Sequence, residues 1–196
     1  GKKTLYVNLF TSAKLQNKDF VVTQTTRFPF EPKTTITIDK AGKYSIAIRH
    51  PEWVGHDFAI KINGQPVNFE FSEGKAYYVT FTHKWKKGDV IEVSLPMVLR
   101  YEVCPNYEDY IAFKYGPILL GANTTNGSEK LQNEYGLEGR MDHSPGAMGK
   151  QMNLLSAPLL IGARADVLSR VKPQDLSKLT FTIDAKREGV ETYKWT

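Results

Sequence analysis

The stretch "FAIKINGQPVNFEF", residues 58–71, carries the clearest structural signal in the chain. Apolar and polar residues alternate on both sides of Asn63-Gly64, which is the pattern of half-buried strands. Asn-Gly between two such runs is typical of a two-residue hairpin turn, because both central positions of that turn need a positive φ. The stretch therefore predicts a β-hairpin that buries one face.

Similar runs lie on both sides of this hairpin and are separated by turn signals. Before it come "TLYVNLF", "FVVTQTTRF", "TTITID" and "YSIAIRH", and after it come "KAYYVTFTHKW" and "VIEVSLPMVLRYEV". β-Branched and aromatic residues favour strands, while "SEG" (72–74) and "KKGD" (86–89) predict further hairpin turns. Short strands, regular turns and no amphipathic helix predict an all-β, antiparallel sandwich of jelly-roll-like form.

Composition narrows the class of protein. The chain has 196 residues, of which 41% are hydrophobic and 24% charged, enough to build a core in one large or two small domains. The net charge of +5 comes from lysines scattered among acids, so we predict no nucleic-acid partner. No stretch approaches the roughly 20 apolar residues of a membrane span, and none is predicted.

The sequence contains few cysteine and histidine residues, which are common metal ligands in proteins. Cys104 is the one cysteine, which excludes an intrachain disulfide and a cysteine-based zinc cluster. We interpret it as a small buried hydrophobe rather than as a reactive thiol. The histidines have no metal-ligand spacing: His50, His56, His83 and His143. No metal and no cofactor are predicted for this chain.

No catalytic residue is predicted either. A glycosidase needs two carboxylates that flank one bond, and the candidates stand in or beside strand-like runs: Glu102, Glu108 and Asp109. We interpret them as solvated or loop residues. Asp142, His143 and Ser144 are neighbours in sequence, whereas the members of a catalytic triad converge from separate parts of a fold.

The run "YIAFKYGPILLGA", residues 110–122, reads as a strand interrupted by Gly116-Pro117. Proline cannot donate a ladder hydrogen bond, and glycine allows a bend. One hypothesis is that residues 110–115 end their pairing there and residues 118–122 pair in another sheet, as at the corner of a sandwich. The equally favoured alternative is a bulge at a sheet edge.

Two tryptophans flank predicted turns, Trp53 in "HPEWVG" and Trp85 in "HKWKKG". An exposed tryptophan on a sandwich can stack on a sugar ring or on a partner domain. The alternative, which we favour, is that each tryptophan covers the core at the end of a sheet.

Six pieces occur in an order that resembles one enzyme family: "LYVNLF", "TQTTRFPFE", "IAIRHPEWVG", "INGQPV", "WKKGDVIEVSLPM" and "YIAFKYGPILLGA". The order is similar to the region that follows the catalytic barrel in glycoside hydrolase family 127 (GH127), which includes β-L-arabinofuranosidases. The resemblance covers about residues 4–122 and continues weakly through "GRMDHSPGAMG" and "APLLIG".

This resemblance implies a parent enzyme whose (α/α)6 barrel holds a cysteine nucleophile beside zinc. Those motifs are not found in the chain, and the nucleophile role is not assigned to Cys104. The implied organisation is a β-sandwich at residues 1–122 that follows a barrel outside this sequence. Residues 123–196 would then form a long loop and further strands, with the end of the last sandwich missing after Thr196.

Residues 123–157 have no periodicity and are long for a connection. We expect this segment to cross the outside of the sandwich and to lie against the barrel, with Arg140, Asp142 and His143 contacting the partner domain or a sugar. The alternative is a disordered surface loop.

Three function classes are compatible with these observations. The favoured one is a non-catalytic accessory sandwich that packs against the barrel of a GH127-like enzyme acting on plant-type glycans. The others are a carbohydrate-binding module and an independent enzyme.

Overall fold

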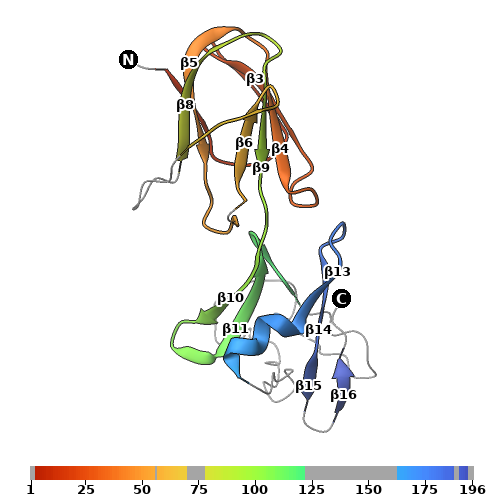
Figure 1. Cartoon of the computed structure of the whole chain (residues 1–196). Coiled ribbons are helices and arrows are strands. Elements are labelled where there is room, and N and C mark those ends of the chain that lie inside the picture. The colour runs from red at the N-terminus through yellow and green to blue at the C-terminus, as the bar shows by residue number, and fades with distance from the viewer. Residues whose placement is uncertain (1–2, 56, 70–77, 122–162, 188–189, 194–196) are drawn as a thin grey trace, which may run out of the picture. The chain divides into compact units, whose positions relative to one another are not determined.

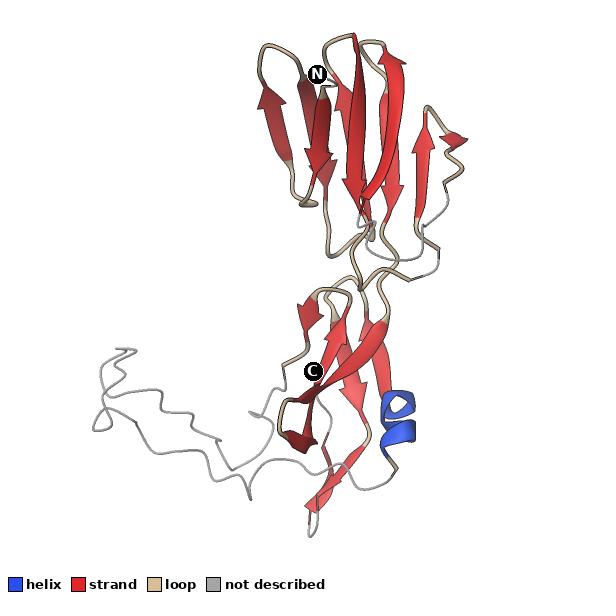
Figure 2. Cartoon of the chain, turned by 90° about the vertical axis from the view of Figure 1, so that its left-hand side faces the viewer, coloured by secondary structure: helices blue, strands red, loops and turns tan. Residues whose placement is uncertain are grey.

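The computed structural model describes residues 3–55, 57–69, 78–121, 163–187 and 190–193. The chain divides into two compact units, residues 1–120 and 121–196, and each is described here by itself. Strands make up nearly all of the regular structure (Figures 1 and 2), so the predicted all-β sandwich class is confirmed.

The first unit begins with strands that match most of the predicted runs. They are β1 (Thr4–Val7), β2 (Ala13–Gln16), β3 (Val21–Thr26), β4 (Lys33–Ile38), β5 (Gly42–Arg49), β6 (Ala59–Ile62), β7 (Gln65–Pro66), β8 (Tyr78–Trp85) and β9 (Val90–Ser94). They are followed by β10 (Leu99–Cys104), β11 (Tyr107–Tyr115) and β12 (Ile118–Leu119). The sequence runs did not predict the short, fully exposed strand β2.

Strands β1 to β9 form two sheets. The larger has the order β2-β3-β4-β9-β6-β7, and every pair in it is antiparallel. The smaller has the order β1-β5-β8, in which β5 and β8 are antiparallel but β1 and β5 are parallel. The antiparallel arrangement predicted for the sandwich thus has one exception among these strands, the parallel pair of β1 and β5. Residues 8–41 make the long crossover that a parallel pair requires, since they first build β2, β3 and β4.

Both sheets contribute to one core, as a sandwich requires. Ile36 and Ile38 on β4 and Ile46 and Ile48 on β5 are at most 1% exposed. They belong to one cluster with apolar side chains of β1, β3, β6, β8 and β9. The alternating isoleucines of "TTITID" and "YSIAIRH" therefore supply four of the side chains of this core. Burying each of them contributes roughly 1.5–3 kcal/mol.

Two turns test the predicted hairpins. Asn63 and Gly64 have φ of 50° and 78°, and they join β6 to β7 as predicted. The turn at residues 86–89 exists, but β8 pairs with β5 whereas β9 pairs with β4 and β6. It therefore crosses from one sheet to the other, and the prediction of a hairpin there is wrong. The predicted turn at 72–74 lies outside the described residues.

Gly116 and Pro117 form the turn of a tight hairpin. Gly116 has φ of 56°, and Tyr115 pairs with Ile118 and Lys114 with Leu119 in the β10-β11-β12 sheet. Proline cannot take a positive φ, so the turn is of the II′ kind rather than I′. The chain reverses within one sheet, so both the change of sheet and the edge bulge are wrong.

The second unit contains one short helix and two hairpins among its described residues. They are the 3-10 helix η2 (Arg164–Arg170), the pair β13 (Val171–Asp175) and β14 (Thr180–Ile183), and the pair β15 (Ala185–Arg187) and β16 (Val190–Tyr193). The runs "LTFTIDA" and "VETYKW" contain β-branched and aromatic residues, which favour strands, and they form β14 and β16. The helix was missed because seven residues are too few to show a helical period.

Candidate functional site

One exposed surface of the first unit combines aromatic rings with hydroxyl and amide groups. Alternation turns Leu5 and Val7 of β1 into the core, so Tyr6 between them points outward and is 61% exposed. Tyr78, at the start of β8, is 37% exposed. The two rings meet edge to face, with centroids 5.5 Å apart at 88°.

Polar groups and small residues surround these rings. The Tyr78 hydroxyl donates a hydrogen bond of 2.7 Å to Oδ1 of Asn8. Ala47 lies in register between Tyr6 and Thr80 and is 1% exposed, although its side of β5 is the outer one. We call Tyr6, Asn8, Ala47, Tyr78 and Thr80 the tyrosine face. Ring surfaces beside hydroxyls and an amide suit contact with another protein surface or with a sugar.

The sequence pattern alone did not reveal the tyrosine face. Tyr6 and Tyr78 are far apart in the chain and come together because β1 and β8 both pair with β5. A usable signal was present in "LYV" and "YVT", where alternation exposes each tyrosine beside a buried neighbour.

Trp85 is a core residue and not a contact residue. It is 1% exposed at the end of β8, and its Nε1–H donates a hydrogen bond of 3.1 Å to the carbonyl of Tyr44. A sugar or partner domain cannot stack on a ring that is buried in this way. The candidate contact role of Trp85 is therefore wrong, and the favoured alternative, coverage of the core at a sheet end, is confirmed.

Trp53 is half-buried in the loop between β5 and β6. Its ring stacks on Phe28, with centroids 5.3 Å apart at 21°, and both side chains pack against the core. The described contacts thus tie Trp53 mainly to its own unit. Its role as a partner or sugar contact stays a prediction.

Cys104 is exposed, so the prediction of a buried residue is wrong. It precedes the two-residue turn Pro105-Asn106 and pairs with Tyr107 across that turn. Asn106 has φ of 67°, a conformation that asparagine tolerates better than most residues. The turn places the exposed Cys104 at the tip of the β10–β11 hairpin.

Glu102 belongs to an ion-pair network and has the wrong electrostatics for a general acid. Its carboxylate contacts Lys114 and, at 3.3 Å, Arg100, whose Nη1 also donates to the Gly116 carbonyl at 2.6 Å. The hydrogen bond from Lys114 lowers the pKa of Glu102, while a general acid needs a raised pKa. Glu108 is exposed, and the side chain of Asp109 lies outside the described set.

The described histidines pack against aromatic rings. His50 meets Phe58 edge to face with centroids 4.7 Å apart, and His83 lies 4.9 Å from the Trp85 ring. Burial lowers the pKa of His50. Within the described ranges, no group of three His, Cys, Asp or Glu residues is placed to hold a metal ion.

The remaining candidates fall in the part of the chain that the structure leaves undescribed. Arg140, Asp142 and His143, the whole segment 123–157, and His56 lie outside the described residues. Their predicted contacts therefore stay predictions. Among the described helices, none is both long and apolar enough to cross a membrane.

Comparison with protein families divides the chain into two parts. Residues 4–97 match the model "Beta-L-arabinofuranosidase, GH127 middle domain", and residues 100–194 match a domain of unknown function, DUF4986. This boundary differs from the division of the compact units at residue 120. The ladders favour the family boundary, because β10, β11 and β12 pair only with one another among the described strands. The predicted boundary at residue 122 stays a prediction.

Three solved structures are similar to part of the chain. A GH127 β-arabinofuranosidase is 26% identical, with a TM-score of 0.51 over 60% of this chain and 22% of that one. A GH127 β-L-arabinofuranosidase from Geobacillus stearothermophilus T6 is 22% identical, with a TM-score of 0.50 over 61% and 20%. A protein described as a glycoside hydrolase is 32% identical, with a TM-score of 0.49 over 58% and 20%. No curated protein matches the chain. The chain thus spans about a fifth of the length of these structures.

Proposed function

We propose that this chain, whose residues 4–97 match the GH127 middle domain, is a non-catalytic accessory region of a GH127-like glycoside hydrolase. In this proposal it follows the catalytic barrel and packs against it, and the parent enzyme acts on plant-type glycans. The match to the middle domain is the single observation that carries the proposal.

The chemistry of the described residues supports an accessory role. Glu102 is held in its charged form by Lys114 and Arg100. Cys104 stands exposed at a hairpin tip, where it does not resemble a nucleophile held beside zinc by other cysteines. The zinc implied by the family resemblance therefore does not fit the described residues of this chain, and we assign it to the barrel.

The tyrosine face is the surface that we assign to the contact with the barrel. Tyr6 exposes 61% of its surface, and an aromatic ring of this size gains most when a partner covers it. Only about a fifth of each similar solved chain is matched, so a parent enzyme of that size has a partner surface to offer.

Activity of the isolated chain tests the proposal. We expect no hydrolysis of an aryl β-L-arabinofuranoside above the buffer blank, because the described residues supply no pair of carboxylates with the required properties. The parent enzyme, which contains the barrel, serves as the positive control. Turnover by the isolated chain that a point substitution within it abolishes would contradict the accessory role.

A second candidate function is carbohydrate binding, favoured by one specific observation. The exposed Tyr6 ring lies beside the hydroxyl of Tyr78 and the amide of Asn8, as a sugar-binding surface requires. Affinity electrophoresis on a neutral arabinan separates the two candidates. Retardation of the isolated chain, lost in Tyr6→Ser, favours sugar binding, whereas free migration favours a surface reserved for the barrel.

A further inference from the structure

One end of the sandwich is built by loops that are hydrogen-bonded to one another. The loops are residues 17–20, 39–41, 63–64 and 86–89, next to the start of β1. Backbone bonds join three of the loops to the strand residue next to another loop: Lys40 N–H to Val21 O (3.1 Å), Gly88 N–H to Ile38 O (2.8 Å) and Asn63 N–H to Val90 O (2.8 Å). The Lys40 ammonium also donates to the Lys18 carbonyl at 2.7 Å. The end is therefore one connected surface.

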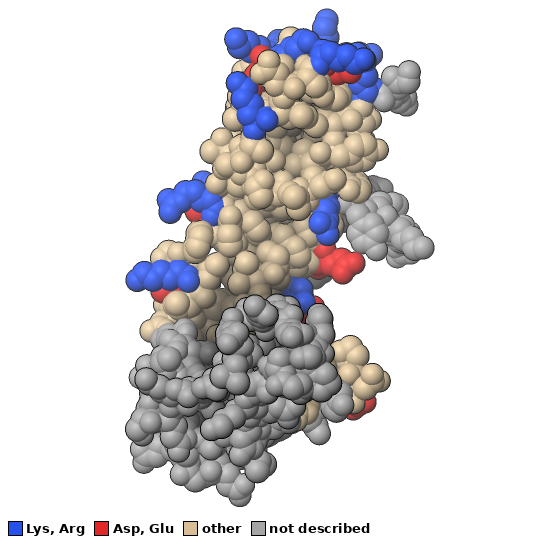
Figure 3. Space-filling model, turned by 180° about the vertical axis from the view of Figure 1, so that it is seen from behind, with Lys and Arg blue, Asp and Glu red and all other residues tan. Residues whose placement is uncertain are grey.

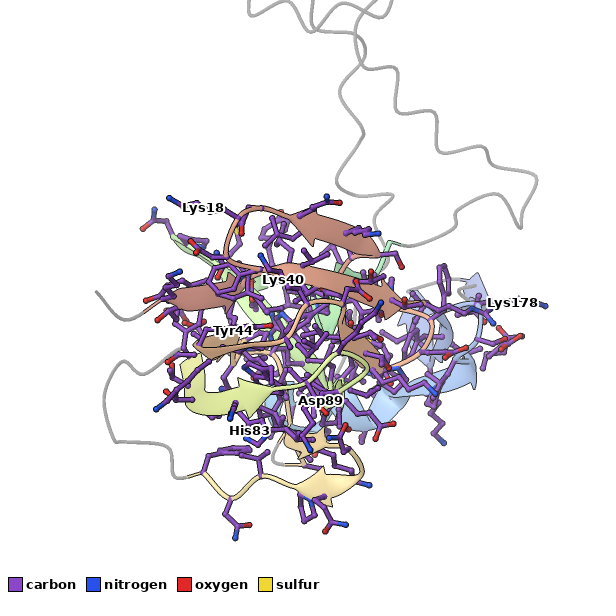
Figure 4. The ribbon with its side chains drawn as sticks, turned by 90° about the horizontal axis from the view of Figure 1, so that it is seen from above. Lys18, Lys40, Tyr44, His83, Asp89 and Lys178 are labelled. Atoms are coloured by element: carbon purple, nitrogen blue, oxygen red, sulfur yellow. The ribbon has the colours of Figure 1, made fainter. Side chains whose placement is uncertain are left out.

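Lysines are concentrated on this surface. Seven of the exposed lysines on these loops and on the strand residues beside them are Lys3, Lys18, Lys40, Lys43, Lys84, Lys86 and Lys87. We call this set the lysine end. Figure 3 shows a group of basic side chains at the upper end of the first unit, and Figure 4 looks down on that end with Lys18 and Lys40 labelled.

The aspartates of the same loops are bound within the fold. Asp89 accepts hydrogen bonds from the Lys86 backbone N–H (2.7 Å) and from Nδ2 of Asn63 (3.0 Å). Asp39 accepts one from the Thr23 hydroxyl at 2.6 Å, and Asp19 pairs with Lys3. Seven lysines against three aspartates leave an excess of four positive charges here, compared with +5 for the whole chain. This surface thus carries a local excess of positive charge.

We propose that the lysine end binds an acidic polysaccharide, with its ammonium groups pairing with the carboxylates of successive sugar units. A connected basic surface attracts a polyanion more strongly than scattered charges do. A lysine side chain carries a point charge on a flexible stem. Lysines on separate loops can therefore pair with carboxylates that are spaced along a polymer, without requiring a fixed pairing geometry. The choice of a glycan rests on the proposed function, whereas the choice of an anion rests on the charge alone.

The composition of the lysine end argues against nucleic acid as the occupant. The four loops contain no arginine, the residue that dominates bidentate recognition of phosphates and bases. Phe20, Tyr44 and Trp85, which lie on or beside these loops, are all at most 8% exposed, so none of these three can stack on a base.

Affinity electrophoresis of the whole chain through polygalacturonate tests the proposal. We expect retardation that is lost on methyl esterification of the polymer. It should also be lost when salt rises from about 0.01 M to about 1 M, since screening then shortens from about 30 Å to about 3 Å. The substitutions Lys18→Gln, Lys40→Gln, Lys86→Gln and Lys87→Gln together should weaken binding at least about tenfold, which corresponds to a loss of about 1.4 kcal/mol.

A matched control removes four positive charges elsewhere: Arg27→Gln, Lys33→Gln, Lys172→Gln and Lys178→Gln. Both variants change the net charge from +5 to +1, and equal melting temperatures would show that both fold. The control should keep at least half of the wild-type affinity. Equal losses in the two variants, or no retardation of the wild type, would overturn the proposal.

Two further probes identify the class of polyanion. Tighter binding to a double-stranded DNA oligonucleotide or to vesicles containing phosphatidylserine than to polygalacturonate would overturn the glycan assignment. Failure in any of these measurements is distinct from failure of the proposed function, because the arabinofuranoside assay and the contact of the tyrosine face with the barrel do not involve the lysine end.

Discussion

Trp85→Ala should destabilise the first unit by about 3–5 kcal/mol, the usual cost of truncating a buried tryptophan. The side chain is 1% exposed, and its ring lies 6.0 Å from the ring of Tyr44 and 6.0 Å from that of Phe81. Truncation leaves a cavity and removes the hydrogen bond to the Tyr44 carbonyl. Equilibrium unfolding in urea, followed by circular dichroism, measures this loss directly.

Trp53→Ala is the matched control for this measurement. Trp53 is half-buried, so its truncation removes the stacking on Phe28, worth about 0.5–1.5 kcal/mol, and a smaller buried area than truncation of Trp85 does. The account predicts a much larger loss at Trp85 than at Trp53. Equal losses, or a larger loss at Trp53, would contradict the position of Trp85 in the core.

Gly116→Ala should cost about 2–5 kcal/mol, as the sum of two effects. At φ of 56° a residue with a Cβ pays about 1–2 kcal/mol. The new methyl group would also lie 2.5 Å from Cγ and 2.7 Å from Sδ of Met97, and such overpacking usually costs about 1–3 kcal/mol. Urea unfolding of the variant gives the total.

Two variants separate these effects. Gly64 also has a positive φ, 78°, but a Cβ there meets no atom within 4 Å, so Gly64→Ala should show only the backbone cost. In a Met97→Ala background, the cost of Gly116→Ala should fall toward that of Gly64→Ala. If Gly116→Ala costs no more than Gly64→Ala in the wild-type background, Met97 does not pack against the turn as described.

The strands and their buried faces could be predicted from the sequence because alternation is a local property. Ile36 and Ile38, and likewise Ile46 and Ile48, point to one side of a strand whatever the strand pairs with. The turn at Asn63-Gly64 was predictable for the same reason, since its φ angles depend on those two residues alone.

The partner of each strand depends on contacts between residues that are far apart in the sequence. Strand pairing could therefore be predicted less well than the strands themselves. The residues at 86–89 can form a turn both in a hairpin and in a connection between two sheets. Only the pairing of β9 with β4 shows that the turn connects two sheets. Trp85, beside this turn, could have been either a contact residue or a core residue, and its 1% exposure shows the second, favoured alternative. The tyrosine face was not found because β5 alone brings Tyr6 and Tyr78 together.

The burial of the tyrosine face in the parent enzyme is the most direct test of the accessory role. Tyr6→Cys in a Cys104→Ser background provides one thiol on this face, and Leu15→Cys on the exposed strand β2 is the control. The rate of alkylation is measured in the isolated chain and in the parent enzyme that carries the barrel. We expect rapid labelling of both thiols in the isolated chain and strong protection of the Tyr6→Cys thiol alone in the parent. Equal labelling of that thiol in the two proteins would contradict it.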